Sequence, residues 1–568
     1  MAQAKGSISP IEEVMGAQSP VEESKRFLAL ALFQRVPSVL SRICNDWVLC
    51  GVIGVVALGL DLYRLGEPGL WFDEILSVER ARQSISVIWQ IVTGAQPNMA
   101  LYYFLLHYWL HFTALFSLPD SEDIVRLPSV IFAVLSAIVV FWLGRRFFGR
   151  TGGFAAAGLY VLNDLQLVYA QETRSYALQL FLLCLSWYAL FAALTGTSHQ
   201  KKWWFCYVVT AILAVYAHLF SLLIFFVQVL AAGGLLFLPG PWQAKARARL
   251  RPLIGSMVMT GILIIPMLVA SRVGGKTDWL PIPKPVDVYY LFLTISGNSK
   301  IFLGIITVCV LFGLLAALIA SRQNWSSPLS GVIRQDEHSK PSGLYRYVPL
   351  GFALLCWLIV PVVVSYVVSQ KSEHLFSSRY LVTIVPPLFL LVGMSIAVLR
   401  WRLVKVVLTF CLLLLALHYV PLYYQSAQVE DWRTPTQWVV QHYQQNDGMV
   451  CYDNSQGCQV STEYYLRLYK SPAHFSSDSP GAFRWVTYDI TNRLGNYQAA
   501  VDIHALAAYA AKHPHLFFIT ARLSGEQSVE KAQVARHWLD SHYRLLGQFS
   551  NATVTIRLYL TNTSIITT

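Results

Sequence analysis

Two adjacent carboxylates, Asp73 and Glu74, lie in the apolar and aromatic stretch Leu70–Ser77. They follow the first long apolar run, residues 47–63, which is long enough to enter a bilayer. A carboxylate at the edge of a membrane costs solvation energy, so we expect the pair to have a function or a partner. Asp73 could accept a proton from a hydroxyl group, with Glu74 beside it. The alternative is a solvated loop pair or the cap of a following helix.

More polar side chains occur where other apolar runs meet. Gln171, Glu172 and Arg174 separate two such runs, and His218 lies between two more. A Glu and an Arg at a membrane boundary are costly unless they are paired or functional. We therefore expect Gln171, Glu172 and His218 to bind a substrate. For His218, packing at a helix end is an equal alternative.

Arginines at the same boundaries suit a phosphate group. Arg379 and Tyr380 open one apolar run, and Arg126 precedes another. A guanidinium binds phosphate oxygens in a planar fork. The sequence thus predicts that Arg174, Arg379 and Tyr380 hold a phosphate and that Arg126 contacts the substrate. The alternative for Arg126 and Arg379 is anchoring at the membrane interface by their long side chains.

These groups together suggest the displacement of a phosphate leaving group that is attached to a lipid. Asp73 would take the proton of the acceptor hydroxyl, while Arg174 and Arg379 would neutralise the departing phosphate. The sequence has no Walker-type glycine loop, no His/Cys metal spacing and no Gly-x-Ser-x-Gly elbow. We expect no required cofactor, although a divalent cation near Asp73 and Glu74 stays open.

The composition is that of a polytopic membrane protein. Of 568 residues, 55% are hydrophobic and 13% charged, and the mean hydropathy is +0.48; a soluble chain is about a quarter charged. The net charge of +12 comes from Lys and Arg clustered in short loops, which is how membrane proteins fix their orientation. No basic helix or aromatic-basic platform indicates a nucleic-acid partner.

Eleven apolar runs could each cross a bilayer. They are residues 47–63, 127–143, 153–170, 176–195, 204–218, 219–238, 253–270, 301–320, 347–369, 380–399 and 403–423. A twelfth run, Met99–Phe116, is ambiguous. All the basic loops fall on one side if this run lies along the membrane, so the positive-inside rule favours eleven spans with the N-terminus in the cytoplasm.

This topology divides the chain into three parts. Residues 1–46 form a cytoplasmic segment, with an interfacial helix at 27–40 and no cleavable signal peptide. Residues 47–424 form the membrane module, whose long outer loop 64–126 holds the acidic pair and two interfacial helices at about 83–93 and 98–116. Residues 425–568 form a small extracytoplasmic α/β domain, in which helices and strands alternate and in which Cys451 and Cys458 could form a disulfide.

Five short motifs then follow one another in a specific order. They are Trp71–Glu74, Pro97–Tyr103, Arg126–Ser129, Gly144–Gly149 and Tyr169–Leu178. This order and spacing resemble the bacterial GT-C glycosyltransferases of family 39, which are related to the protein O-mannosyltransferases and the lipid A aminoarabinose transferase. Arg379-Tyr380 followed by Pro386-Pro387, and Asp431-Trp432-Arg433, resemble later parts of the family.

The resemblance implies a polyprenyl-phosphate-sugar donor, inverting transfer and catalysis outside the cytoplasm. It implies that Asp73 is the general base and that Glu172 and Arg174 are the functional groups of the second outer loop. Two departures stand out. Asn98-Met99 replaces a Pro-Pro pair of many relatives, and Gln96-Pro97 stands where aminoarabinose transferases have Glu-Lys, which argues against aminoarabinose as the donor sugar.

We therefore predict a multi-pass glycosyltransferase of the plasma membrane that acts on a glycan, lipid or protein acceptor. One alternative is a transporter or flippase of lipid-linked sugars, which should carry ionisable groups near the midplane on interrupted, repeated helices. A second is an assembly protein that acts through its outer domain. That domain shows no Ser/His/Asp or Cys/His set.

Overall fold

The computed structural model of this chain describes residues 45–94, 97–196, 198–238, 242–272, 277, 280–325, 347–371, 373–452, 457–480, 501–523 and 526–562. The chain divides into two units, Met1–Val52 and Ile53–Thr568. Every helix and strand that follows residue 62 belongs to the second unit. The predicted interfacial helix at 27–40 lies outside the described residues.

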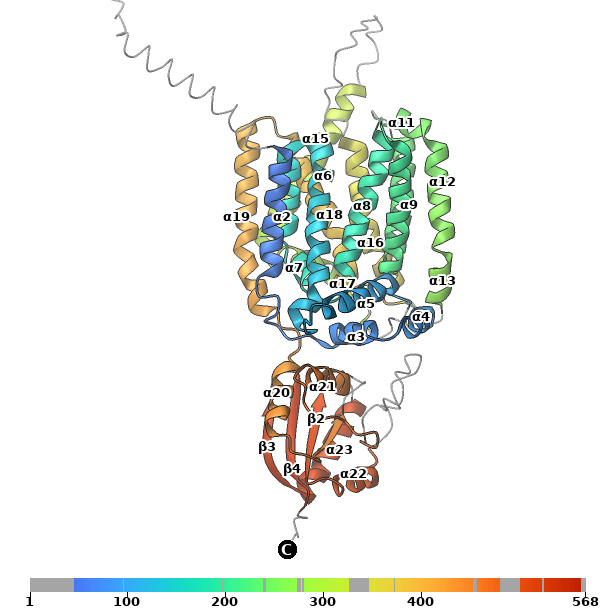
Figure 1. The fold of residues 1–568 in the computed structure, drawn as a ribbon. Coiled ribbons are helices and arrows are strands. Elements are labelled where there is room, and N and C mark those ends of the chain that lie inside the picture. The colour runs from blue at the N-terminus through green and yellow to red at the C-terminus, as the bar shows by residue number, and fades with distance from the viewer. Residues whose placement is uncertain are drawn as a thin grey trace, which may run out of the picture. The chain divides into compact units, whose positions relative to one another are not determined.

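Long apolar helices form the part of the chain that we expected to lie in the membrane (Figure 1). They are α2 (Asp46–Leu62), α6 (Glu122–Val161), α8 (Tyr176–Thr195), α9 (Gln200–Ala217), α10 (Ser221–Phe237), α12 (Leu250–Leu263), α13 (Ile265–Ser271), α15 (Lys300–Trp325), α16 (Tyr347–Val368), α18 (Val385–Val398) and α19 (Arg402–Ser426). Within the described residues, seven stretches have the length and composition to cross a membrane. The predicted multi-pass helical bundle is therefore confirmed.

Helix α6 is a hairpin of two helical limbs, which correspond to two of the predicted spans. The limbs meet at Gly149, whose φ of 81° is non-helical, a conformation that costs a residue with a Cβ about 1–3 kcal/mol. Beyond the turn the two limbs pack so closely that a Cβ on Gly144 would come within 2.8 Å of the Cα of Gly153. The three glycines thus allow a tight turn between the basic residues Arg145 and Arg150.

Short elements interrupt the bundle and position its polar loops. They are α7 (Asp164–Ala170), α11 (Gln243–Ala248), α14 (Pro285–Ile295), α17 (Ser378–Leu381) and the 3₁₀ turn η2 (Val382–Ile384). The predicted span 153–170 is broken, because Asn163 caps α7 by accepting a hydrogen bond from the backbone N–H of Gln166. Helix α7 then ends at Ala170, which places Gln171–Arg174 in the loop before α8.

Three helices lie across one end of the long helices in Figure 1: α3 (Phe72–Ala81), α4 (Ile85–Thr93) and α5 (Ala100–Ala114). Helices α4 and α5 match the two predicted interfacial helices, whereas α3 was not predicted. Exposed aromatic side chains on α4 and α5, including Trp89, Tyr108 and Phe112, are typical of a membrane–water interface.

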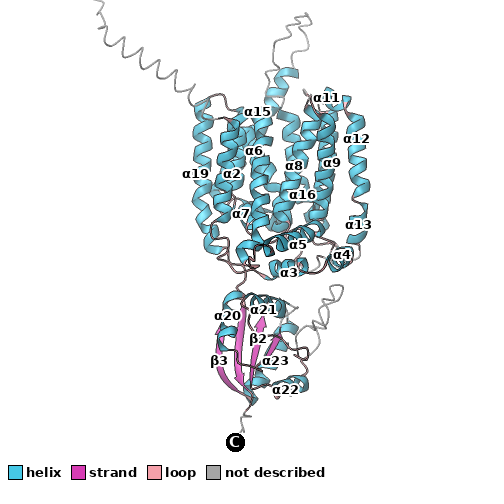
Figure 2. Cartoon of the chain, in the orientation of Figure 1, coloured by secondary structure: helices cyan, strands magenta, loops and turns pink. Residues whose placement is uncertain are grey.

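The C-terminal domain contains a four-stranded sheet covered by helices. Its elements are α20 (Arg433–His442), β1 (Gly448–Tyr452), α21 (Gly457–Leu468), α22 (Ile503–Ala510), β2 (His515–Ala521), α23 (Glu526–His542), β3 (Arg544–Ser550) and β4 (Val554–Leu560). The strand order is β1-β2-β4-β3, parallel between β1 and β2 and otherwise antiparallel. All described strands belong to this domain (Figure 2), and the predicted α/β fold is confirmed.

A disulfide joins Cys451 at the end of β1 to Cys458 at the start of α21. The core of the domain includes Val450, Leu516, Phe518 and Tyr559.

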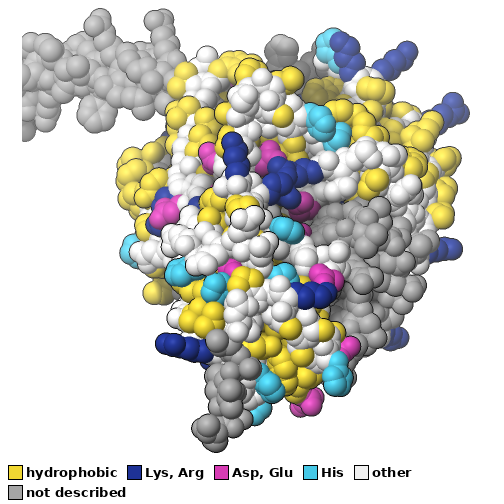
Figure 3. Space-filling view, turned by 60° about the horizontal axis from the view of Figure 1, so that its bottom comes forward, with side chains coloured by type: hydrophobic (Ala, Val, Ile, Leu, Met, Phe, Trp, Pro, Cys, Tyr) yellow, Lys and Arg dark blue, Asp and Glu magenta, His cyan; other side chains and the backbone are white. Residues whose placement is uncertain are grey.

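On the face of the molecule seen in Figure 3, acidic, basic and histidine side chains are interspersed rather than segregated by charge. This mixed surface contrasts with the apolar surface of the long helices, where many Leu, Ile and Val side chains are exposed.

Candidate active site

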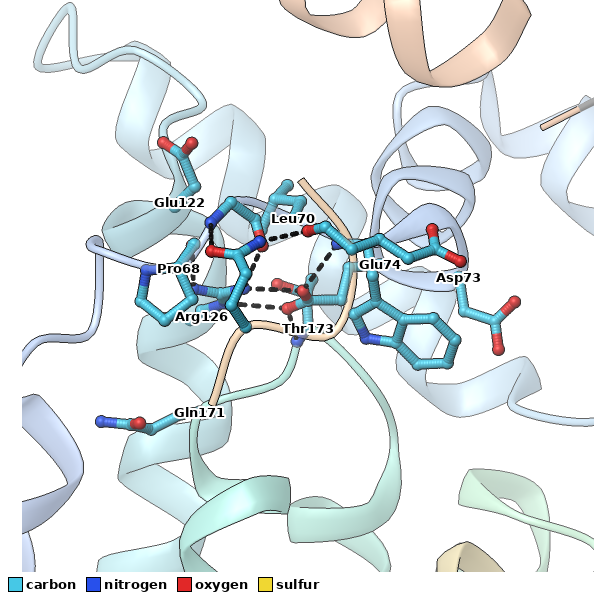
Figure 4. Close-up of polar contacts among 12 residues, drawn as sticks. Pro68, Leu70, Asp73, Glu74, Glu122, Arg126, Gln171 and Thr173 are labelled. Carbon is cyan, nitrogen blue, oxygen red and sulfur yellow. Dashed lines mark hydrogen bonds and ion pairs between the residues drawn. The ribbon is translucent and has the colours of Figure 1, made fainter. Parts of the chain in front are cut away.

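The acidic pair lies in the first turn of α3, which begins at Phe72. Carboxylates are favoured at a helix N-terminus, where backbone N–H groups carry partial positive charge. Because successive helical residues point about 100° apart, Asp73 and Glu74 face different surroundings. In Figure 4 their carboxylates point away from each other.

Asp73 meets the two predicted phosphate-binding arginines. Its Oδ2 lies 3.3 Å from Nη1 of Arg379 and 3.7 Å from Nη2 of Arg174, and Nη1 of Arg174 donates to the Asp73 carbonyl at 3.2 Å. The side chain of Asp73 is 24% exposed and that of Arg379 is 27% exposed. The structure thus brings together one carboxylate and two guanidiniums from three distant segments, and leaves Asp73 and Arg379 partly exposed.

Glu74 is fully buried and forms a two-pronged ion pair with Arg126 (Figure 4). Its oxygens accept from Nη2 and Nε of Arg126 at 2.7 and 2.9 Å, and from the backbone N–H of Thr173 at 2.8 Å. Arg126 also donates to the carbonyls of Leu65 and Pro68 at 2.8 Å. These contacts tie the loop before α3 to the loop before α8. Both side chains are thus occupied within the protein, although we expected Arg126 to contact the substrate.

A divalent cation does not fit between Asp73 and Glu74. Glu74 already accepts hydrogen bonds from Arg126 and Thr173, and two guanidiniums face Asp73, so a cation there would meet repulsion. Among the described residues no group of three or more His, Cys, Asp or Glu side chains gathers as a metal site.

Gln171 anchors the loop before α8. Its Nε2 donates to the carbonyls of Asp61 and Tyr63 at 2.9 Å, and its Oε1 accepts from the hydroxyl of Tyr423 at 2.8 Å. Both ends of the amide are therefore used within the protein. The predicted substrate contact would require these bonds to be exchanged.

Glu172 is buried beside the cluster. Its Oε2 has no hydrogen-bond partner within the described residues, and it lines a small cavity with Glu74, Arg126 and Trp71. Burial, and then the charge of Glu74, raise the pKa of Glu172 to about 8. Its carboxyl group is therefore mostly protonated at neutral pH.

His218 and Tyr380 pack next to the cluster without entering it. The ring of Tyr380 lies 5.3 Å from that of His218 and 5.9 Å from that of Phe220, between centroids. His218 is buried, and a buried ring among aromatic side chains fits the packing alternative better than direct substrate binding.

Several contacts to α3 come from the C-terminal domain and its linker, and sequence reasoning missed them. The hydroxyl of Tyr465 accepts from the backbone N–H of Leu70 at 2.8 Å, and Glu430 accepts from that of Phe72 at 3.0 Å. Arg522 pairs with Glu430 at 3.4 Å, and its guanidinium carbon lies 4.3 Å from the ring centre of Phe72. The only sequence signal was Trp71, which cannot cap a helix with its side chain.

Comparison with known proteins gives one family match. Residues 102–269 match the family described as dolichyl-phosphate-mannose-protein mannosyltransferase. That segment carries three of the five motifs in full: Arg126–Ser129, Gly144–Gly149 and Tyr169–Leu178. No curated protein matches the sequence of the chain.

Solved structures resemble nearly the whole chain. ArnT from Cupriavidus metallidurans in the apo state has a TM-score of 0.52 at 12% identity, covering 90% of this chain and 97% of ArnT. ArnT bound to undecaprenyl phosphate gives 0.51 at 11%, covering 90% and 98%. The Archaeoglobus fulgidus oligosaccharyltransferase complex with Zn and sulfate gives 0.47 at 12%, covering 88% and 79%. The likeness to ArnT shows that this chain has the same fold, the GT-C fold.

Proposed function

We propose that this chain, a membrane glycosyltransferase of the GT-C type, transfers a sugar from a polyprenyl-phosphate donor to an acceptor hydroxyl with inversion. One observation carries the proposal. Asp73 is a partly exposed carboxylate held by two arginines, while the neighbouring Glu74 is sequestered by Arg126. The cluster therefore offers one base beside two phosphate-binding groups.

In the proposed step, the acceptor oxygen attacks the anomeric carbon of the sugar. The bond from that carbon to the phosphate oxygen breaks, and the phosphate leaves with the electron pair. Asp73 takes the proton of the acceptor hydroxyl. Because one displacement occurs without an enzyme-bound intermediate, the anomeric configuration inverts.

Arg174 and Arg379 are the proposed phosphate ligands. Before the donor arrives they neutralise Asp73. A phosphate between them would compete with Asp73 for both guanidiniums, and Asp73 would then be released to act as a base. The two guanidiniums would also stabilise the negative charge that develops on the leaving phosphate. The capture of ArnT with undecaprenyl phosphate supports a lipid-phosphate donor.

The remaining predicted site residues take positioning roles in this proposal. The Glu74–Arg126 pair and Gln171 fix the two loops that carry Asp73 and Arg174. The rings of His218 and Tyr380 pack against each other next to Arg379. Breaking a buried pair of this kind by removing one partner costs about 3–5 kcal/mol, so Glu74 and Arg126 serve the site through the fold.

The acceptor and the membrane complete the proposal. The end of the bundle with α3, α4 and α5 would face outside the cytoplasm, in the plasma membrane, with the C-terminal domain on the same side. A lipid-linked donor would reach Asp73 within the bilayer surface. The acceptor, a glycan, lipid or protein, would approach from the aqueous side.

Asp73→Asn tests the base. We expect release of polyprenyl phosphate from a panel of polyprenyl-phosphate sugars to fall about 10²- to 10⁴-fold, with normal membrane insertion and folding. Asp123→Asn, the same change at an exposed position of the same outer loop, is the control and should retain activity. Near-normal turnover by Asp73→Asn would exclude Asp73 as the base.

A further inference from the structure

Arg80 lies on the face of α3 that carries Asp73. Residues spaced four and three apart share a helix face, so Asp73, Ser77 and Arg80 form one row. Nη1 of Arg174 donates to the hydroxyl of Ser77 at 3.1 Å, which shows that this row faces the arginine cluster. Arg80 thus extends the proposed donor site by one helical turn beyond Ser77.

The guanidinium of Arg80 is buried without an acidic partner. Arg80 is 9% exposed. Its Nη1 donates to the hydroxyl of Tyr103 at 2.9 Å, and its guanidinium carbon lies 5.7 Å from the centre of that ring. Its Nε is buried with no hydrogen-bond partner, and among the described residues no carboxylate pairs with it.

The acidic side chains nearby are committed elsewhere. Glu79, the preceding residue, pairs with Arg467 of the C-terminal domain. Asp120 pairs with Arg82. Neither acid is left to neutralise Arg80, although both lie in the same outer loop. Arg82, two residues further on, differs from Arg80 in that it has a carboxylate partner, so it is a suitable control.

In the proposed reaction the positive charge of Arg80 is left without a balancing negative charge. Asp73 and the phosphodiester of a donor carry one negative charge each, which matches Arg174 and Arg379. Arg80 then adds one positive charge that neither group balances. Holding a buried guanidinium without a counter-ion costs several kcal/mol, and a tyrosine ring and hydroxyl offset only part of that cost.

Resting on the proposed function, we infer that Arg80 and Tyr103 form a subsite for a carboxylate substituent on the transferred sugar. Seven residues along a helix span about 10 Å, and helical side chains lean back toward the N-terminus. The Cα atoms of Asp73 and Arg80 are therefore about 10 Å apart along the helix, and the Arg80 side chain leans back toward Asp73, which leaves a separation on the scale of one sugar ring attached to the phosphate. A substituent on the far side of that ring would reach Arg80.

Matched donors test the inference. The probes are undecaprenyl-phosphate glucose, galactose and mannose, each beside its C6-carboxylate counterpart, with release of undecaprenyl phosphate as the readout. We expect the wild type to prefer one carboxylate donor over its neutral partner by about tenfold or more in kcat/KM, since charge-assisted hydrogen bonds are the strong ones. Release from neutral donors alone would overturn the inference and leave the proposed function standing. Release from none of the six donors would contradict both.

Substitutions separate a subsite from a structural role. We expect Arg80→Gln to bring the ratio of kcat/KM for the carboxylate and neutral donors close to one, and Arg80→Lys to keep part of the preference. Arg82→Gln should leave the ratio unchanged. If Arg80→Gln lowers both donors by the same factor, the ratio stays at its wild-type value and Arg80 serves only the packing of α3 against α5.

Discussion

Asp73 and Glu74 have different surroundings because adjacent residues of α3 point about 100° apart. Asp73 therefore faces Arg379, whereas Glu74 faces Arg126. The buried pair holds the loops together, and the accessible carboxylate is left for chemistry. In the proposed function Arg379 has two roles: it pairs with Asp73 before substrate binds, and it is a phosphate ligand afterwards.

Substitution of Arg379 should therefore affect donor binding in a graded way. We expect Arg379→Ala to raise the KM for a polyprenyl-phosphate sugar about tenfold or more and Arg379→Lys to raise it less, because an ammonium replaces the charge but not the planar fork. Steady-state kinetics with varied donor concentration would measure this. Equal effects of the two changes would support interfacial anchoring instead.

Glu172 should make the stability of the protein depend on pH. Its pKa of about 8 in the folded state lies above the value of about 4.3 in an unfolded chain. Between these values the folded state binds more protons than the unfolded state, so the free energy of unfolding falls as the pH rises from about 4.3 to about 8. The Glu172→Gln variant has no carboxyl group to ionise at this position, so its free energy of unfolding does not fall for this reason.

We expect the melting temperature of Glu172→Gln to exceed that of the wild type by more at pH 8 than at pH 5. Thermal unfolding in detergent at both pH values, with Asp123→Asn as an exposed control, would measure the difference. A gap of the same size at both pH values would show that Glu172 ionises normally.

The sequence singled out the residues of the proposed chemistry more readily than the residues that hold them in place. Asp73, Arg174 and Arg379 stood out because charged side chains at membrane boundaries are costly without a purpose. Glu430, Tyr465 and Arg522 did not stand out, because a polar residue in a soluble domain needs no special explanation. Their contacts join residues 70–72 to positions hundreds of residues away, and spacing along the chain carries no information on such pairs.

Helix α3 carries Asp73, and its own cap is limited to Glu74, whose carboxylate accepts from the backbone N–H of Trp71 at 3.3 Å. Its N-cap residue, Trp71, makes no side-chain cap hydrogen bond. Glu430 and Tyr465 instead accept from the backbone N–H groups of Phe72 and Leu70. The linker and the C-terminal domain thus hold the start of the helix that carries Asp73.

Loss of this cap should lower the rate of transfer more than the affinity for the donor. We expect Glu430→Ala and Tyr465→Phe each to destabilise the start of α3 by about 0.5–2 kcal/mol and to reduce kcat several-fold, since Asp73 would be less firmly oriented. Lys512→Ala removes an exposed ion pair with Asp478 elsewhere in the same domain and is the control. An unchanged kcat in both cap variants would show that Asp73 is positioned without this domain.

Element prediction succeeded where the hydrophobic pattern was long or alternating. The long apolar runs, α4, α5 and the alternation of helices and strands in the C-terminal domain were expected, whereas α3, α21 and α22 were not. These three helices have only 10, 12 and 8 residues. Short helices gain most of their stability from tertiary packing. The packing of α21 against α3 arises only in the folded chain.

The distribution of basic residues predicts an orientation for the helical bundle. Figure 1 shows α11 at the opposite end of the bundle from α3, α4 and α5. Near that end Arg249 donates to the carbonyl of Ala193 at 2.8 Å, and Arg146 donates to the hydroxyl of Thr195 at 3.1 Å. Cations there also suit the C-terminal end of α8. The positive-inside rule assigns such an end to the cytoplasm.

Epitope tags in the full-length chain would test this orientation. We expect a tag after Thr568 to be detected on intact cells, or on spheroplasts if an outer envelope blocks the antibody. A tag between Ser198 and His199, in the loop between α8 and α9, should be detected only after the membrane is permeabilised. Both tagged proteins should still release polyprenyl phosphate, which shows that the insertions preserve the fold. Detection of the loop tag on intact cells would reverse the topology. It would place Asp73 on the cytoplasmic side, where the lipid-linked donor would have to be presented from the opposite leaflet.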